Sequence, residues 1–156
     1  MTSDDADTVP DAPSDPVRFP LWRELGSADR HNPKTLRRQD IPVTLGVYGW
    51  FRDGVPVYAG RAKGRDGLRG RLSVHLSTGP DLSRSTFRSW VAVSVLDVPR
   101  PVTRQRPTVM TEEQVAQVNA WITSCYVGWV EKPTVAATIA FEEALLREWK
   151  PRLNHD

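Results

Sequence analysis

The chain has 156 residues, of which 39% are hydrophobic and 26% charged, a composition typical of one compact domain with short appendages. No stretch approaches the ~20 consecutive apolar residues of a membrane helix, and residues 1–20 lack the basic and then apolar stretches of a secretory signal. The single cysteine, Cys125, excludes an intrachain disulfide. We therefore expect a cytoplasmic protein that has no membrane partner.

Charge is unevenly distributed along the chain. The net charge is only +2, yet residues 1–16 contain five aspartates and no basic residue. Residues 60–106, in contrast, contain ten basic residues and only three aspartates. A positive field of this kind attracts phosphodiesters, although a solvated arginine-rich surface would give the same count. The charge alone leaves both interpretations open.

The first 42 residues contain no sustained apolar period. Residues 1–16 combine prolines, aspartates and small residues that cannot bury a core, which predicts a disordered acidic tail. Residues 17–42 contain scattered apolar anchors and predict an irregular arm packed on the domain. The folded domain itself is expected over residues 43–156.

That domain opens with a predicted β-hairpin and an amphipathic helix. The β-rich runs 44–52 and 55–59 flank Asp53-Gly54, a pair typical of a type I′ turn. Leucines then recur every four residues from Leu68 to Leu76, which predicts a helix over about 66–77 that ends before Gly79-Pro80.

The middle of the chain is predicted to be mainly helical. Residues 85–98 fit both a helical stripe and a strand alternation, and we favour a helix capped by Ser85. Prolines and arginines over 99–108 indicate a loop. Thr111 and Gln114 have the spacing of a capping box and predict the start of the next helix.

A short buried strand over 126–130 and a last helix complete the prediction, with the helix beginning at Pro133 or Thr134 and ending at Pro151. The expected order is β-β-α-α-α-β-α. This order describes an α+β fold in which a small three-stranded β-sheet is flanked by helices.

These elements carry six side chains that could converge on one surface. They comprise two phenols on paired strands, a guanidinium and an imidazole four residues apart on one helix face, a carboxylate in the last helix and an amide after it. In chain order they are Tyr48, Tyr58, Arg71, His75, Glu142 and Asn154. Each also has a plainer interpretation, because hairpin tyrosines usually pack and a helical histidine or glutamate is often simply solvated.

The same residues resemble the GIY-YIG nuclease family. The name motif reads Gly46-Val47-Tyr48 and Tyr58-Ala59-Gly60, the following helix reads Arg69-Gly70-Arg71-Leu72-Ser73-Val74-His75, and the last helix carries Glu142 before Lys150-Pro151-Arg152-Leu153-Asn154. The similarity covers roughly residues 42–80 and 126–154, with Val47 and Ala59 in place of isoleucines. Residues 81–125 are then expected to be a basic helical insertion.

The resemblance implies a Mg²⁺-dependent endonuclease that hydrolyses phosphodiester bonds in DNA with one metal ion. Glu142 would hold Mg²⁺, or Mn²⁺ in its place, together with waters and phosphate oxygens. Tyr48 would be the general base or its relay, Arg71 would stabilise the phosphoryl charge, and the other three would bind phosphate, assist proton transfer and brace the site: Tyr58, His75 and Asn154.

The basic residues around the motifs are expected to contact phosphate without reading sequence. They are Arg61, Lys63, Arg69, Arg84 and Arg88. Because the chain offers no separate recognition domain, we expect either a homodimer or recognition of branched or damaged DNA, and RNA stays open as a substrate. The alternatives are a non-cleaving nucleic-acid-binding module of the same fold and a subunit that needs a partner for activity.

Overall fold

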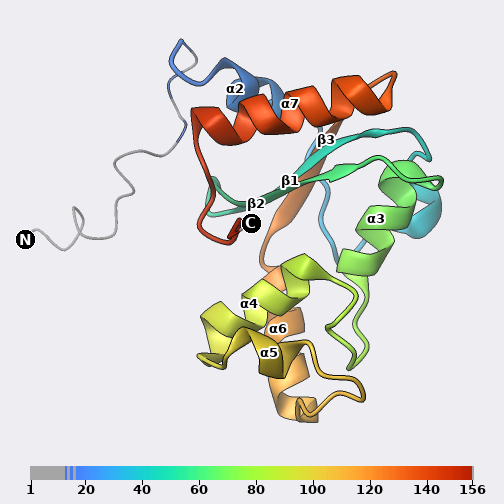
Figure 1. The fold of residues 1–156 in the computed structure, drawn as a ribbon, viewed down its shortest axis with the longest axis vertical. Coiled ribbons are helices and arrows are strands. Elements are labelled where there is room, and N and C mark those ends of the chain that lie inside the picture. The colour runs from blue at the N-terminus through green and yellow to red at the C-terminus, as the bar shows by residue number, and fades with distance from the viewer. Residues whose placement is uncertain (1–12, 14, 16, 156) are drawn as a thin grey trace, which may run out of the picture.

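The computed structural model describes residues 13, 15 and 17–155. Its centre is a three-stranded antiparallel sheet of β1 (Gly46–Arg52), β2 (Val55–Ala62) and β3 (Tyr126–Glu131), in the order β2-β1-β3 (Figure 1). The predicted α+β class and the three-stranded sheet are therefore confirmed. The predicted disordered tail lies outside the described residues, except for residues 13 and 15.

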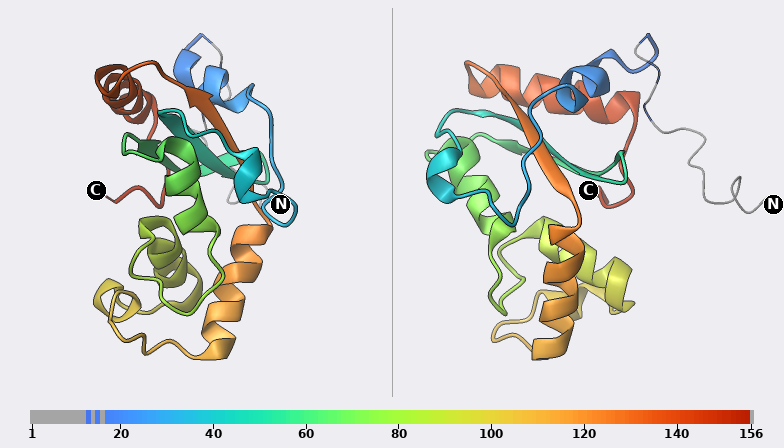
Figure 2. Two further views of the ribbon diagram at one scale, coloured as in Figure 1. Left: turned by 90° about the vertical axis from the view of Figure 1, so that its right-hand side faces the viewer. Right: turned by 180° about the vertical axis from the view of Figure 1, so that it is seen from behind.

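Helices cover both faces of the sheet. One face carries α2 (Pro20–Gly26) and α7 (Val135–Glu148), and the other carries α3 (Gly67–Leu76). Figures 1 and 2 show that the remaining three helices form a lobe beyond the sheet, on the side of α3; they are α4 (Thr86–Leu96), α5 (Arg100–Thr103) and α6 (Glu112–Thr123). Within the described part of the chain, no helix is long and apolar enough to cross a membrane.

The hairpin has the predicted turn. Asp53 and Gly54 have φ angles of 54° and 80°, so both central residues are in the left-handed region that a type I′ turn requires. In the resulting register Tyr48 lies opposite Gly60, and the ladder shifts by a bulge after Trp50. Because β1 pairs with β3 on its other side, β2 is an edge strand.

The arm before the hairpin is more ordered than the sequence predicts. Residues 17–42 contain α2 and a 3₁₀ turn, η1 (Arg38–Asp40), where an irregular arm was expected. Helix α2 spans seven residues, which is too short to establish an apolar period. It is held by burial instead: Trp22 is 2% exposed, and its indole N–H donates to the carbonyls of Leu145 and Trp149.

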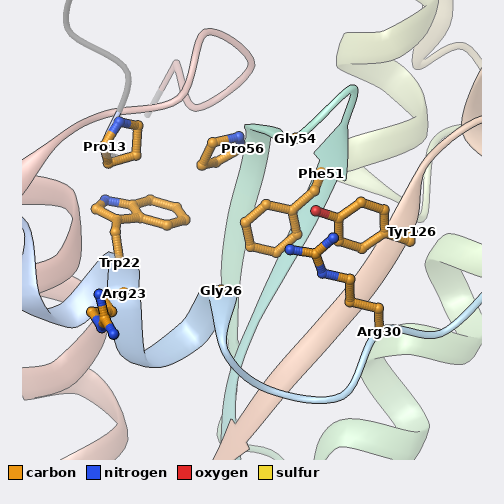
Figure 3. Close-up of a pocket in the computed structure, with 9 residues that line it drawn as sticks. All are labelled: Pro13, Trp22, Arg23, Gly26, Arg30, Phe51, Gly54, Pro56 and Tyr126. Atoms are coloured by element: carbon orange, nitrogen blue, oxygen red, sulfur yellow. The ribbon is translucent and has the colours of Figure 1, made fainter. Parts of the chain in front are cut away.

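A recess of about 170 Å³ lies between this arm and the hairpin turn. Figure 3 shows Phe51 between Trp22 and Tyr126. The Arg30 guanidinium lies 4.6 Å from the centroid of the Tyr126 ring. None of the six predicted site residues lines this recess.

The other face of the sheet shares one continuous core with the helical lobe. The rings of Trp50 and Phe87 stack at 4.6 Å, which joins β1 directly to α4. The ambiguous segment 85–98 is thus helical, and the Ser85 hydroxyl caps it by accepting from the Arg88 amide. One prediction here is wrong: residues 100–103 of the expected loop form α5, whose four residues are too few to show a period.

The later elements follow their sequence signals. Thr111 and Gln114 form the predicted capping box of α6, and the strand expected over 126–130 is β3. Thr134 caps α7 by accepting from the Ala137 amide, so the last helix begins where the sequence indicates.

Gly60 is a position where the fold requires glycine. A Cβ added there would collide with the Tyr48 phenol, whose oxygen and ring carbons lie across the strand. We expect Gly60→Ala to lower the free energy of unfolding by about 1–3 kcal/mol through overpacking. Gly26→Ala is the matched control, because its Cβ would meet no atom within 4 Å. Urea denaturation measures both, and equal stabilities of the two variants would contradict the assignment.

Candidate active site

A buried hydrogen bond joins the first motif tyrosine to the helical histidine. Tyr48 is 1% exposed and His75 0%, and the Tyr48 hydroxyl lies 2.6 Å from His75 Nε2. Strand β1 supplies the phenol and α3 supplies the imidazole, while Gly60 leaves the space that the phenol fills. The ring of Tyr58 lies beside both, 6.5 Å from that of Tyr48 and 6.0 Å from that of His75.

Ser85 continues this chain of hydrogen bonds from the helical lobe. Its hydroxyl oxygen lies 2.6 Å from His75 Nδ1 and also accepts from the Arg88 amide at 3.0 Å. The sequence identifies Ser85 only as a helix cap. Its contact with His75 is a tertiary one, which no local pattern indicates.

Burial holds the pair in its neutral form. Desolvation raises the pKa of Tyr48 well above its usual value, the nearby Tyr58 adds to the rise, and Arg71 opposes it. Desolvation, followed by the positive charges of Arg71 and Arg88, lowers the pKa of His75 well below its usual value. At neutral pH the site therefore contains a protonated phenol beside an unprotonated imidazole, which can accept a hydrogen bond from it at Nε2.

Glu142 lines a cleft at the edge of β2. The cleft has a volume of about 390 Å³ and is lined by Tyr58 and Asn154 as well as Glu142. A carboxylate oxygen of Glu142 lies 3.3 Å from a guanidinium nitrogen of Arg61, and the carboxylate side chain is 14% exposed. Burial raises the pKa of Glu142, and the charge of Arg61 opposes that rise. Arg61, expected to contact phosphate, thus pairs with the predicted metal ligand in the structure.

Asn154 braces the cleft through the backbone of β2. Its Oδ1 accepts from the Ala59 amide at 2.9 Å and its Nδ2 donates to the Ala59 carbonyl at 2.8 Å. Leu153 adds a backbone bond to Val57. The C-terminal segment is therefore fixed along the edge strand.

The donor set fits a magnesium ion that takes few ligands from protein. Among the described residues no three His, Cys, Asp or Glu side chains gather into a metal-binding group. Mg²⁺ is nevertheless commonly bound by one or two carboxylates, with waters and substrate phosphates completing the octahedron. Glu142 could supply that carboxylate, provided that Arg61 releases the oxygen it now contacts.

Basic hollows extend from the cleft along α3. Arg61 also lines a hollow of about 540 Å³, together with Lys63 and Arg71. That hollow shares two of its lining residues, Asp66 and Gly70, with another of about 580 Å³, where further cations lie: Arg38 and Arg84. These two adjoining hollows, here called the basic trough, are lined by five cationic side chains and by Asp66 and Asp81. The excess of positive charge would attract a phosphodiester backbone.

Two of the expected phosphate contacts have other uses. Arg88 is 0% exposed and donates to the Gly79 carbonyl and the Asn119 side chain, and burial lowers its pKa to about 10. Its assignment as a surface contact is therefore wrong. Arg69 donates from Nε to the Ile41 carbonyl at 2.8 Å, which fastens α3 to the arm. Arg84 is 75% exposed, and its Nε lies 3.9 Å from a carboxylate oxygen of Asp81.

The structure thus brings the predicted residues to one region. Tyr58, Glu142 and Asn154 line the cleft, Tyr48 and His75 lie behind Tyr58, and Arg71 lines the adjoining hollow. Comparisons of the chain with family models, with curated proteins and with solved structures find no match.

The buried imidazole makes stability depend on pH. His75 takes up a proton near pH 6.5 in the unfolded chain but only at much lower pH in the folded one, so acid favours unfolding. Its contribution to the unfolding free energy should fall by up to about 1.4 kcal/mol per pH unit below ~6.5. Urea denaturation of wild type and His75→Gln between pH 8 and 5 measures this.

At pH 8 the difference between the two proteins gives the cost of the substitution alone, because the imidazole is then neutral in both states. We expect that difference to shrink as the pH falls. A constant difference across the range would show that His75 titrates alike in the folded and unfolded chain.

Proposed function

We propose that this chain is a Mg²⁺-dependent endonuclease of the GIY-YIG type that hydrolyses phosphodiester bonds in DNA. The observation that carries the proposal is the buried Tyr48–His75 hydrogen bond beside a cleft that is lined by Glu142 and adjoins the basic trough. The neutral imidazole can take up a proton that the phenol relays to it, and the trough supplies the positive field that a phosphodiester needs.

Tyr48 acts in this proposal as a relay. Its phenol is 1% exposed, whereas Tyr58 lines the cleft and lies between Tyr48 and the substrate space. When Nδ1–H of His75 donates to Ser85, Nε2 is left as an acceptor for the Tyr48 proton. The attacking water would pass its proton through Tyr58 to the Tyr48 oxygen while Tyr48 gives its own proton to Nε2, so that the buried phenol stays neutral and the imidazole holds the additional proton.

The charged residues of the site would have two roles, which are binding of the phosphate and binding of the metal ion. Arg71 and Lys63 line the trough next to the cleft and would bind the phosphate oxygens. Glu142 would hold Mg²⁺, which supplies Lewis-acid stabilisation of the charge that develops on phosphate. Arg61 pairs with Glu142 in the structure and would turn to the phosphate when the carboxylate takes a cation.

A non-cleaving DNA-binding module is the second candidate. The Arg61–Glu142 ion pair favours it, because that contact occupies a carboxylate oxygen which the metal would need. In such a module Arg61 would permanently neutralise Glu142, while the trough would still bind a phosphate backbone with strong salt dependence. The two candidates predict the same binding and differ in cleavage.

Cleavage assays on a mixed panel test the proposal. Supercoiled plasmid, linear duplex, single strand, branched DNA and structured RNA are each incubated with Mg²⁺, Mn²⁺ or EDTA. Metal-dependent cutting of DNA that is lost in Tyr48→Phe is the expected result. Salt-sensitive binding without cutting in any metal would instead identify the binding module, and cutting of RNA alone would contradict the substrate.

Replacing the single cleft carboxylate that pairs with Arg61 separates metal use from binding. We expect Glu142→Gln to lower Mg²⁺-dependent cleavage by roughly 100-fold or more, because the amide no longer binds the cation. DNA binding in EDTA should persist or tighten as Arg61 is released. Glu143→Gln is the matched control, since Glu143 lines the same cleft without contacting Arg61. Equal losses in both variants would contradict the assignment of Glu142.

Ser85 is expected to position His75 for the relay. Ser85→Ala should lower the cleavage rate by roughly 10-fold, part of the ~100-fold or more that a positioned proton acceptor contributes. The pH profile of cleavage should also shift, because the imidazole loses its Nδ1 partner.

Two variants separate this role from helix capping. Ser85→Thr keeps the hydroxyl and should restore rate and pH profile, whereas Ser83→Ala removes a nearby hydroxyl that bonds Asp81 and should change neither. A rate loss in Ser85→Ala without any shift in the pH profile would assign Ser85 to folding alone.

A further inference from the structure

The indole ring of Trp90, on α4, contacts an imidazole and a guanidinium. The imidazole of His155 stacks on one side with ring centroids 3.7 Å apart and planes 19° from parallel. The Arg100 guanidinium lies 4.1 Å from the indole centroid. Both Trp90 and His155 line the cleft that contains Glu142.

The indole also has an unused donor. Trp90 Nε1 is buried and has no hydrogen-bond acceptor in the structure. Trp50 in the core has an unpaired Nε1 of the same kind, so the position of Trp90 at the cleft, and not its donor, is what indicates a ligand.

His155 can leave Trp90 without disturbing the segment before it. Asn154 is held by two hydrogen bonds to Ala59, and Leu153 is buried and bonded to Val57. The anchored chain therefore ends immediately before the stacked imidazole. Rotation of His155 alone would expose the indole face toward the cleft.

We propose that this face of Trp90 is a nucleobase subsite, in which an unpaired base next to the cleaved phosphodiester displaces His155 and stacks on the indole. Stacking on an aromatic side chain is available to every base, because each has a π-face. Arg100 strengthens the platform from behind.

The subsite restricts the substrate class. A base inside a duplex is stacked on both faces and cannot lie on Trp90 unless it leaves the helix. DNA that already has unpaired nucleotides, such as a flap, a bulge or a single strand, should therefore be favoured over a continuous duplex. This inference rests on the proposed function for the position of the phosphate, and its test is made without cleavage.

Binding is measured in EDTA with Glu142→Gln as the background. A flapped DNA carries 2-aminopurine at its unpaired position, and a fully paired duplex of equal length is the reference. Stacking should quench the 2-aminopurine on binding. Adding Trp90→Ala should weaken binding to the flap about 10-fold and abolish the quench, while duplex binding stays unchanged.

His155→Ala is expected to change the affinity for flapped DNA in the opposite direction. Removing the imidazole frees the indole face, so this variant should bind the flap several-fold more tightly, and it leaves the anchoring bonds of Asn154 in place. Trp121→Ala is the control for loss of a tryptophan elsewhere, because Trp121 lies on α6 and does not line the cleft.

The outcomes separate the two proposals. Unchanged flap affinity and quench in both Trp90→Ala and His155→Ala would overturn the subsite even if the wild type cuts DNA. The expected quench and opposite shifts, found in a protein that cuts nothing, would keep the subsite and reject the nuclease. Absence of nucleic-acid binding by the wild type would overturn both.

Discussion

The buried hydrogen bond between Tyr48 and His75 is the constraint on which the rest of the site depends. Two polar groups withdrawn from water must satisfy each other, because either one left alone would bear the full cost of desolvation. Their 2.6 Å contact fixes β1 against α3. It also requires glycine at position 60, where any side chain would occupy the space of the phenol. The same burial sets the neutral protonation states that a proton relay needs.

The helical lobe contributes directly to the site. Its first helix, α4, supplies Ser85 to the buried histidine at one point and Trp90 to the cleft at another. Arg88 of the same helix is buried and donates to the Gly79 carbonyl and to Asn119 on α6, which ties the lobe together from inside. The lobe therefore has to be in place before the imidazole has its second partner.

Local signals predicted those elements that depend on local physics. The Asp53-Gly54 turn and the Thr111-Gln114 capping box are complete within a few residues, so the sequence alone indicates them. Arginines, in contrast, look alike in a sequence. Whether one is buried, as Arg88 is, or pairs with a distant carboxylate, as Arg61 does, is decided by tertiary packing. The second role of Ser85 was hidden for the same reason.

Two contacts inside the cleft resemble what a substrate would bring. Arg61 places a positive charge against Glu142, where a metal ion would lie, and His155 places a flat ring on Trp90, where a base would lie. A ligand must replace both contacts, and only the surplus over what they contribute appears as affinity. A cation alone would replace only the Arg61 contact, and a base alone would replace only the His155 contact. On the proposed function, the cleft thus selects a strand that presents phosphate, cation and unpaired base together.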